Sequence, residues 1–90
     1  MIHVTGTLTC ATEVEAEIVR RCLPTHIALS RAEPGCLTFN VDPTEDPLVW
    51  RLDETFTDRA AFEAHQARTR ASEWFTATNG LARDFKVTEG

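Results

Sequence analysis

Apolar and polar side chains alternate along the first residues of the chain. Every second position from 2 to 8 is apolar or glycine, and the positions between them carry histidine or threonine. A side-chain period of two indicates a strand with one face towards a core. The alternation returns at residues 36–42 and 48–56, and residues 81–88 are expected to supply a fourth strand. The expected inward positions are Leu37, Phe39 and Val41 in the second strand and Leu48, Trp50, Leu52, Glu54 and Phe56 in the third.

A first helix is predicted between the first two strands. Thr12 and Glu15 have the spacing of a capping box, which favours a helix that begins after Thr12. Pro24 lacks a backbone donor, so we expect the helix to kink or restart there. Residues 33–35, Glu-Pro-Gly, are expected to end it. The side chains expected on one side of this helix are Val14, Ile18 and Cys22.

A second helix is predicted after the third strand, with Thr57 or Asp58 as its cap. Its inward stripe follows the spacing i, i+3, i+7 and consists of Phe62, His65 and Thr69. Ser72 is expected to cap a short further helix, and Asn79-Gly80 is typical of a turn. That short helix would carry Trp74 and Phe75.

The order strand, helix, strand, strand, helix, strand predicts a fold class. It is the βαββαβ arrangement of a ferredoxin-like α+β fold, with one antiparallel sheet and helices on one side of it. Ninety residues with an apolar share of 42% suffice for one core, so we expect residues 1–90 to form a single domain. A chain this short leaves apolar surface incompletely covered, which favours a homodimer.

Composition excludes several classes of partner. The formal net charge is −5 and basic residues form no stripe, so we expect no nucleic-acid partner. The first residues lack the pattern of a signal peptide, and no apolar run approaches the ~20 residues of a membrane span, so no membrane association is expected. Three cysteines cannot close a disulfide framework, which favours a cytoplasmic location. The three histidines lack paired ligand spacing, so we expect no metal site.

Residues 30–65 carry a recognisable pattern. They read S-R-A-E-P-G-C-L-T-F-N-V and then D-P-T-E-D-P-L-V-W-R-L-D-E-T-F-T-D-R-A-A-F-E-A-H. Glu33-Pro34-Gly35 before the second strand, Glu54 near the end of the third and a helical His65, in this order, resemble the antibiotic biosynthesis monooxygenase family. The resemblance implies a dimeric α+β barrel, in which two sheets pack face to face, and a ligand cavity between helices and sheet.

The same resemblance implies several activities. Family members include oxygenases that oxidise quinols, anthrones and related polyphenols without metal or flavin, which implies a small aromatic or quinol-like substrate, O2 and no cofactor. Other members degrade haem or act as isomerases, and a dimeric ligand-binding module without chemistry is a further alternative. Arg70 stands where quinol-oxidising relatives often carry a second histidine, and the chain has no tyrosine. Haem degradation is linked to an asparagine on the first strand, where this chain has threonines.

A few side chains are candidates for chemistry. His65 is the candidate base, because an imidazole pKa near ~6.5 lets its surroundings set its charge; a half-buried structural histidine is the alternative. Glu54 shares an apolar strand face and is expected either to orient His65 or to pair with Arg68. Asn40 and Trp74 are candidate donors to an oxygenated ring. Other candidate substrate contacts, of which the aromatic ones are also ordinary core residues, are Trp50, Phe39, Phe62 and Arg70.

Overall fold

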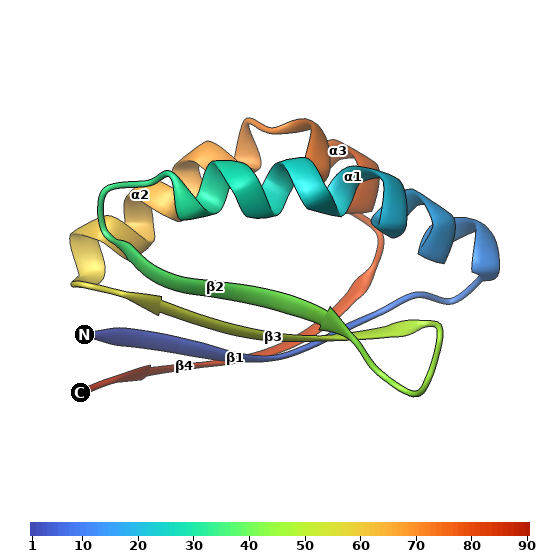
Figure 1. Ribbon diagram of the computed structural model, residues 1–90, viewed down its shortest axis with the longest axis horizontal. Helices are drawn as coiled ribbons and strands as arrows, with labels where there is room; N and C mark the ends of the chain where they lie inside the picture. Colours follow the sequence, from blue (N-terminus) through green and yellow to red (C-terminus); the bar gives the residue numbers. More distant parts are fainter.

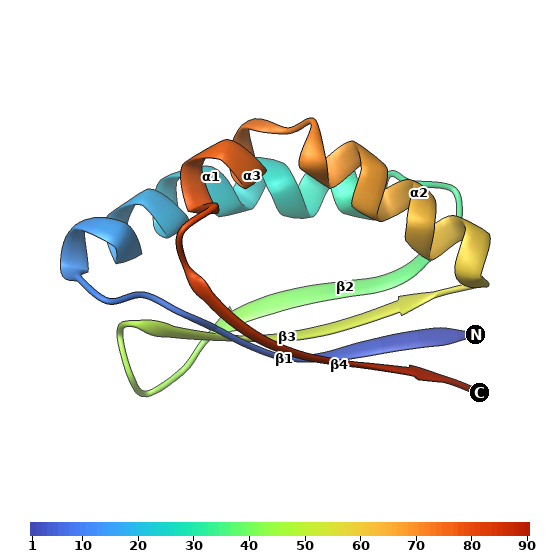
Figure 2. The same ribbon diagram turned by 180° about the vertical axis from the view of Figure 1, so that it is seen from behind.

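A four-stranded antiparallel sheet carries three helices on one of its faces in the computed structural model, which describes residues 1–90 (Figure 1). The elements are β1 (Ile2–Thr9), α1 (Glu13–Arg31), β2 (Cys36–Pro43), β3 (Val49–Phe56), α2 (Arg59–Arg70), α3 (Glu73–Thr78) and β4 (Ala82–Glu89). The strand order is β2-β3-β1-β4, and all neighbours are antiparallel. The predicted ferredoxin-like α+β fold is confirmed. Seen from behind, the helices again lie on one side, and the other face of the sheet is uncovered (Figure 2).

The inward face of the two central strands forms the floor of the core. Ile2, Val4 and Leu8 of β1 are 2–3% exposed, as their alternation predicts. Four of the predicted inward positions of the third strand are buried as well, Glu54 among them at 7% exposure, whereas Leu48 precedes β3 and is half-buried. Glu54 is paired in register with Val4 on one side and with Phe39 on the other. A carboxyl group therefore lies in the middle of an apolar floor.

Strand β2 departs from simple alternation at a β-bulge. Cys36 pairs with Phe56 and Thr38 pairs with Thr55, so Leu37 is the extra residue. Leu37 is 53% exposed, and Cys36 packs against the core in its place. The prediction that Leu37 faces inward is wrong, because a strict period of two does not anticipate an inserted residue.

Helix α1 buries a different stripe from the predicted one. Val14 is 72% exposed, and Ile18 and Cys22 are only half-buried. The predicted inward side is wrong, because the buried stripe combines apolar Val19 and Leu23 with small or polar side chains that hydropathy does not mark as core. The buried residues are Ala16, Val19, Leu23, His26 and Ser30.

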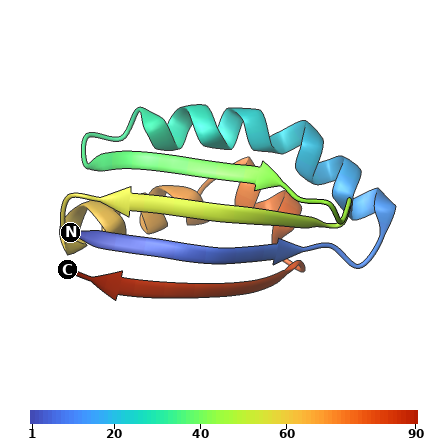
Figure 3. The same cartoon turned by 60° about the horizontal axis from the view of Figure 1, so that its bottom comes forward.

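Pro24 lies inside α1 without interrupting it. The helix is continuous from Glu13 to Arg31, so it does not restart. Its first turns are inclined relative to the rest (Figure 3), as expected where a proline removes one helical hydrogen bond. None of the three helices combines the length and the apolarity that a membrane crossing requires.

The turn that follows α1 packs closely against the start of α2. A Cβ atom on Gly35 would lie 2.2 Å from the Cβ of Ala61. Any residue other than glycine would therefore push the turn and α2 apart. The backbone N–H of Thr57 donates to the Gly35 carbonyl at 2.9 Å. Asp58 caps α2, as predicted, and its carboxylate accepts from the backbone N–H of Ala61. This close approach brings Glu33, at the end of α1, next to the side chains of α2.

Candidate functional site

A cavity of about 390 Å³ lies between the helices and the sheet. All four strands contribute side chains to it, as do α2, α3 and one residue of α1. Its aromatic lining consists of Phe39, Phe62, Trp74, Phe75 and Phe85. Its polar lining includes His26, Glu54, His65, Thr69, Arg70 and Arg83. The volume and the mixture of aromatic walls with a few polar groups are typical of a small-molecule site.

The structure brings most of the predicted site residues together here, but not all of them. Trp50 is buried in the core and does not line the cavity. Asn40 is exposed on β2, and its side-chain oxygen accepts a hydrogen bond from Arg31 at 3.2 Å. Neither residue contributes to the site described below. The predicted residues that do line the cavity are Phe39, Glu54, Phe62, His65, Arg70 and Trp74.

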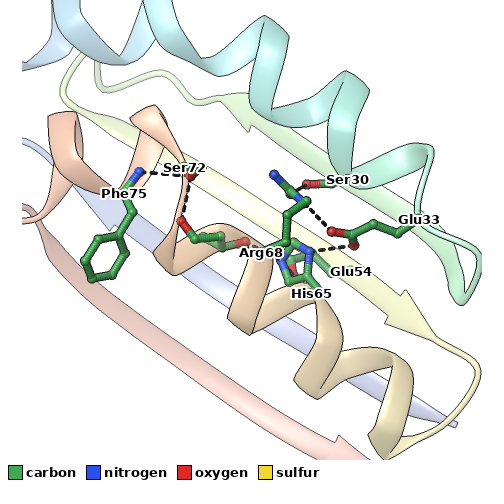
Figure 4. A network of polar contacts seen from close by, with 8 residues as sticks. Ser30, Glu33, Glu54, His65, Arg68, Ser72 and Phe75 are labelled. Carbon is green, nitrogen blue, oxygen red and sulfur yellow. Dashed lines mark hydrogen bonds and ion pairs between the residues drawn. The ribbon is translucent and has the colours of Figure 1, made fainter.

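His65 lies within a polar network that connects α1 to α2 (Figure 4). Its Nδ1 is 2.8 Å from Oε1 of Glu33, whose other oxygen accepts from Nε of Arg68. Arg68 also donates to the hydroxyl of Ser30 at 2.9 Å. A carboxylate at Nδ1 favours the tautomer that holds its proton there, which leaves the lone pair on Nε2.

The second ring nitrogen of His65 is left without a strong hydrogen bond. Nε2 is 3.9 Å from Oε1 of Glu54 and 3.5 Å from Oγ1 of Thr69. Both separations are longer than a good hydrogen bond. His65, Glu54 and Thr69 all line the cavity. The geometry therefore leaves a lone pair available to accept a proton from a ligand.

Burial sets the protonation states of Glu54 and His65, which lie next to each other at the cavity. It raises the pKa of Glu54 to about 8, and the negative charges of Glu33 and Asp53 add to the shift. Burial also lowers the pKa of His65, although its hydrogen bond to Glu33 opposes that change. At neutral pH Glu54 is therefore a protonated acid and His65 a neutral imidazole. The site holds a base beside a neutral proton donor.

Glu33 takes both roles that were expected of Glu54. The prediction of an ion pair between Glu54 and Arg68 is wrong, because Glu33 lies between Arg68 and His65 and binds both. Glu54 also makes no short contact with His65. Glu33 belongs to the Glu33-Pro34-Gly35 pattern, so the sequence did mark the segment, although it gave no sign of the contact.

His26 is a second histidine of the site that sequence spacing did not reveal. Its ring centroid is 6.0 Å from that of His65, and it stacks on Trp74 at 4.9 Å with an interplanar angle of 7°. Burial, helped by the nearby charge of Arg68, lowers the pKa of His26 to about 3. A neutral His26 therefore forms part of the aromatic wall.

Arg83 was also missed by the sequence analysis. It lies on β4, all of whose residues are exposed, at a polar position on the strand face that it shares with Phe85 and Val87. Its side chain nevertheless lines the cavity, and burial lowers the pKa of its guanidinium. Only the pairing of β4 beside β1 brings this residue to the site.

Comparisons with known proteins agree with this architecture. A family model described as antibiotic biosynthesis monooxygenase matches residues 1–77. A candidate antibiotic biosynthesis monooxygenase of Deinococcus radiodurans has a similar structure, with 23% identity, a TM-score of 0.78 and coverage of 100% of this chain and 92% of that one. Rv0793 of Mycobacterium tuberculosis is 20% identical with a TM-score of 0.78, and the match covers 99% of this chain and 93% of that one. PA3566 of Pseudomonas aeruginosa is 29% identical with a TM-score of 0.73, and the match covers 99% of this chain and 94% of that one. No protein with a curated function matches the sequence.

The substitution Glu33→Gln should lower the pKa of His65. Burial already lowers this pKa, and the carboxylate of Glu33 opposes the shift through its hydrogen bond and its charge. An amide keeps the shape of the side chain but not the charge. Heteronuclear NMR of the ring nitrogens should show Nδ1 protonated in the wild type and a lower titration midpoint in the variant. Glu63→Gln, at an exposed position of α2, is the control. A wild-type ring protonated mainly on Nε2 would contradict the network.

Glu54 should make the protein less stable as the pH rises from about 6.5 to about 7.5. The folded chain keeps the Glu54 proton because the pKa is raised to about 8, whereas an unfolded glutamate loses it near pH ~4.3. The folded state then binds more protons, so the free energy of unfolding falls by at most about 1.4 kcal/mol per pH unit. The buried histidines act in the opposite direction, but mainly below pH ~6.5, and cysteines ionise mainly above this window.

Urea unfolding at a series of pH values measures this decline. Glu54→Gln stays neutral at every pH and should remove most of it. Glu63→Gln should retain the wild-type slope. An equally steep decline in Glu54→Gln would show that Glu54 is already ionised in the folded protein.

Proposed function

The chain belongs to the antibiotic biosynthesis monooxygenase family, whose model matches residues 1–77, and we propose that it oxidises a small quinol or polyphenol with O2 in the cavity beside His65. One observation carries the proposal. A buried, neutral His65 keeps its Nε2 lone pair available at an aromatic-lined cavity, while Glu33 holds the opposite side of the ring. This arrangement suits the removal of a proton from a phenolic hydroxyl.

The first step of the proposed reaction is proton transfer from the substrate hydroxyl to Nε2 of His65. The phenolate that results is a much better electron donor than the phenol. Glu33 stabilises the imidazolium that forms, as a carboxylate does in other base-carboxylate pairs. The aromatic walls limit the access of water to the phenolate.

The remaining steps draw their electrons from the substrate alone. The phenolate transfers one electron to O2, and the resulting radical and superoxide combine to form a carbon–oxygen bond. A proton returned from His65 then assists cleavage of the oxygen–oxygen bond. For a hydroquinone the balance is quinol plus O2 to hydroxyquinone plus water. One oxygen atom enters the ring, the other leaves as water, and the substrate supplies all four electrons.

Loss of His65 should abolish most of this activity. A positioned general base contributes about 10²–10⁴-fold to a rate, so His65→Ala should slow O2 uptake by a factor in this range. The assay uses chelator-treated protein and a panel of hydroquinones and anthrones in an oxygen electrode. Glu63→Ala, at an exposed position of α2 outside the cavity, is the control and should keep the wild-type rate. Equal rates in His65→Ala and the wild type would refute the assignment of the base.

A ligand-binding module without chemistry is the alternative that Arg70 favours, because a second histidine is missing there. In that case no quinol of the panel would consume O2, and a bound ligand would be recovered unchanged after long aerobic incubation.

Haem degradation has less support, since Asn40 does not line the cavity with Trp74 and His65. Addition of hemin should therefore cause no Soret shift. An isomerase of small carbonyl compounds would convert its substrate without consuming O2.

We further propose that two copies pair through the uncovered face of the sheet (Figure 2). Light scattering should then give about twice the 10.1 kDa mass of the chain. Thr5 lies near the middle of β1 and points to this face, so Thr5→Arg should produce monomers. Leu29→Arg, at an exposed position of α1, should leave the dimer intact. A wild-type mass of one chain at high concentration would contradict the proposal.

A further inference from the structure

Two arginines without acidic partners line the cavity. Arg70 and Arg83 take part in none of the ion pairs of the structure. Glu54 is the only acidic residue of the lining, and its raised pKa keeps it neutral near pH 7. Glu33 does not line the cavity, and Arg68 balances its charge. A protein of net charge −5 therefore presents a positively charged cavity.

Arg83 is held in a fixed orientation by the end of α3. Its Nη1 donates to the carbonyls of Thr78 at 2.8 Å and Leu81 at 3.3 Å, and its Nη2 donates to Oγ1 of Thr78 at 2.7 Å. Thr78 is itself fully buried, and its hydroxyl donates to the carbonyl of Trp74. The guanidinium is therefore anchored before any ligand arrives, which reduces the entropy lost on binding.

The anchoring leaves part of the guanidinium unused. A guanidinium has five N–H groups, and the contacts with Thr78 and Leu81 occupy both on Nη1 and one on Nη2. The N–H of Nε and the second N–H of Nη2 have no partner. A planar guanidinium presents the N–H of Nε and one N–H of Nη2 side by side, and this pair matches the two oxygens of a carboxylate.

We propose that Arg83 determines specificity by binding a carboxylate of the ligand, so that the preferred substrate is a hydroxylated aromatic acid. The aromatic walls would hold the ring, Nε2 of His65 would meet a hydroxyl group, and Arg83 would pair with the acid. A cation that has lost part of its hydration gains from such a partner, because that loss is then compensated. The oxidation of this acid rests on the proposed function, whereas its binding does not.

Binding of a probe that cannot be oxidised tests the inference separately from turnover. Calorimetry should show that benzoate binds more tightly than benzamide, which has the same shape without the charge. Hydrogen bonds to a charged group predict a ratio of roughly 10–100-fold. Arg83→Met should abolish the preference for benzoate over benzamide. Arg83→Lys keeps a charge but loses the paired donors, so it should retain only a small part of that preference. Arg21→Met, at an exposed position of α1 outside the cavity, is the control and should keep the preference for benzoate.

Two results would overturn the inference. One is equal affinity of the wild type for benzoate and benzamide. The other is an unchanged ratio in a folded Arg83 variant, with folding checked by circular dichroism. Because the Lys variant keeps the long side chain, it provides a second test if Arg83→Met does not fold.

Kinetics then separate a role in specificity from a role in the reaction. With dihydroxybenzoate, Arg83→Met should raise KM and leave kcat nearly unchanged, whereas KM for dihydroxybenzamide should not change. A fall of kcat on both compounds would mean that Arg83 stabilises the phenolate instead, which contradicts the proposal. If neither compound consumes O2 while benzoate still binds through Arg83, the oxygenase proposal fails and the binding site stands.

Discussion

The carboxylate of Glu33 is shared between His65 and Arg68, and the rest of the site depends on that shared contact. A poorly hydrated anion must be paired to be tolerated, and here its two oxygens bind one partner each. The contact joins the end of α1 to α2, and it exists because Gly35 lets the intervening turn lie against Ala61. It also decides which ring nitrogen of His65 keeps a lone pair.

The same anion explains why the nearby Glu54 is neutral. Two carboxyl groups flank one imidazole, and like charges at such short range disfavour ionisation of the second group, which burial disfavours already. Glu33 has Arg68 as a counter-ion, whereas Glu54 has none and holds its proton instead. With Glu54 neutral, the potential in the cavity is set by Arg70 and Arg83. A single buried contact thus determines both the base and the charge that a ligand meets.

Local patterns predicted the fold well, because strand periodicity and helix caps involve neighbouring residues. Thr12, Asp58 and Ser72 all cap helices as expected. Errors arose where packing overrides the pattern, as with the bulge at Leu37 and the buried stripe of α1, which includes His26 and Ser30. Glu54 was recognised as a site candidate because a carboxyl group on an apolar strand face is unusual in sequence as well as in space.

Glu33, His26 and Arg83 could not be recognised in this way. Each is an ordinary polar residue in its own segment, and its role comes only from contacts between distant parts of the chain. The aromatic walls have the same origin, since Phe85 and Val87 of the edge strand β4 are 41% and 45% exposed yet line the cavity. A ligand that covers them supplies packing that the chain itself lacks. It must therefore stabilise the fold by mass action, so a rise in Tm reports occupancy of the cavity without any turnover.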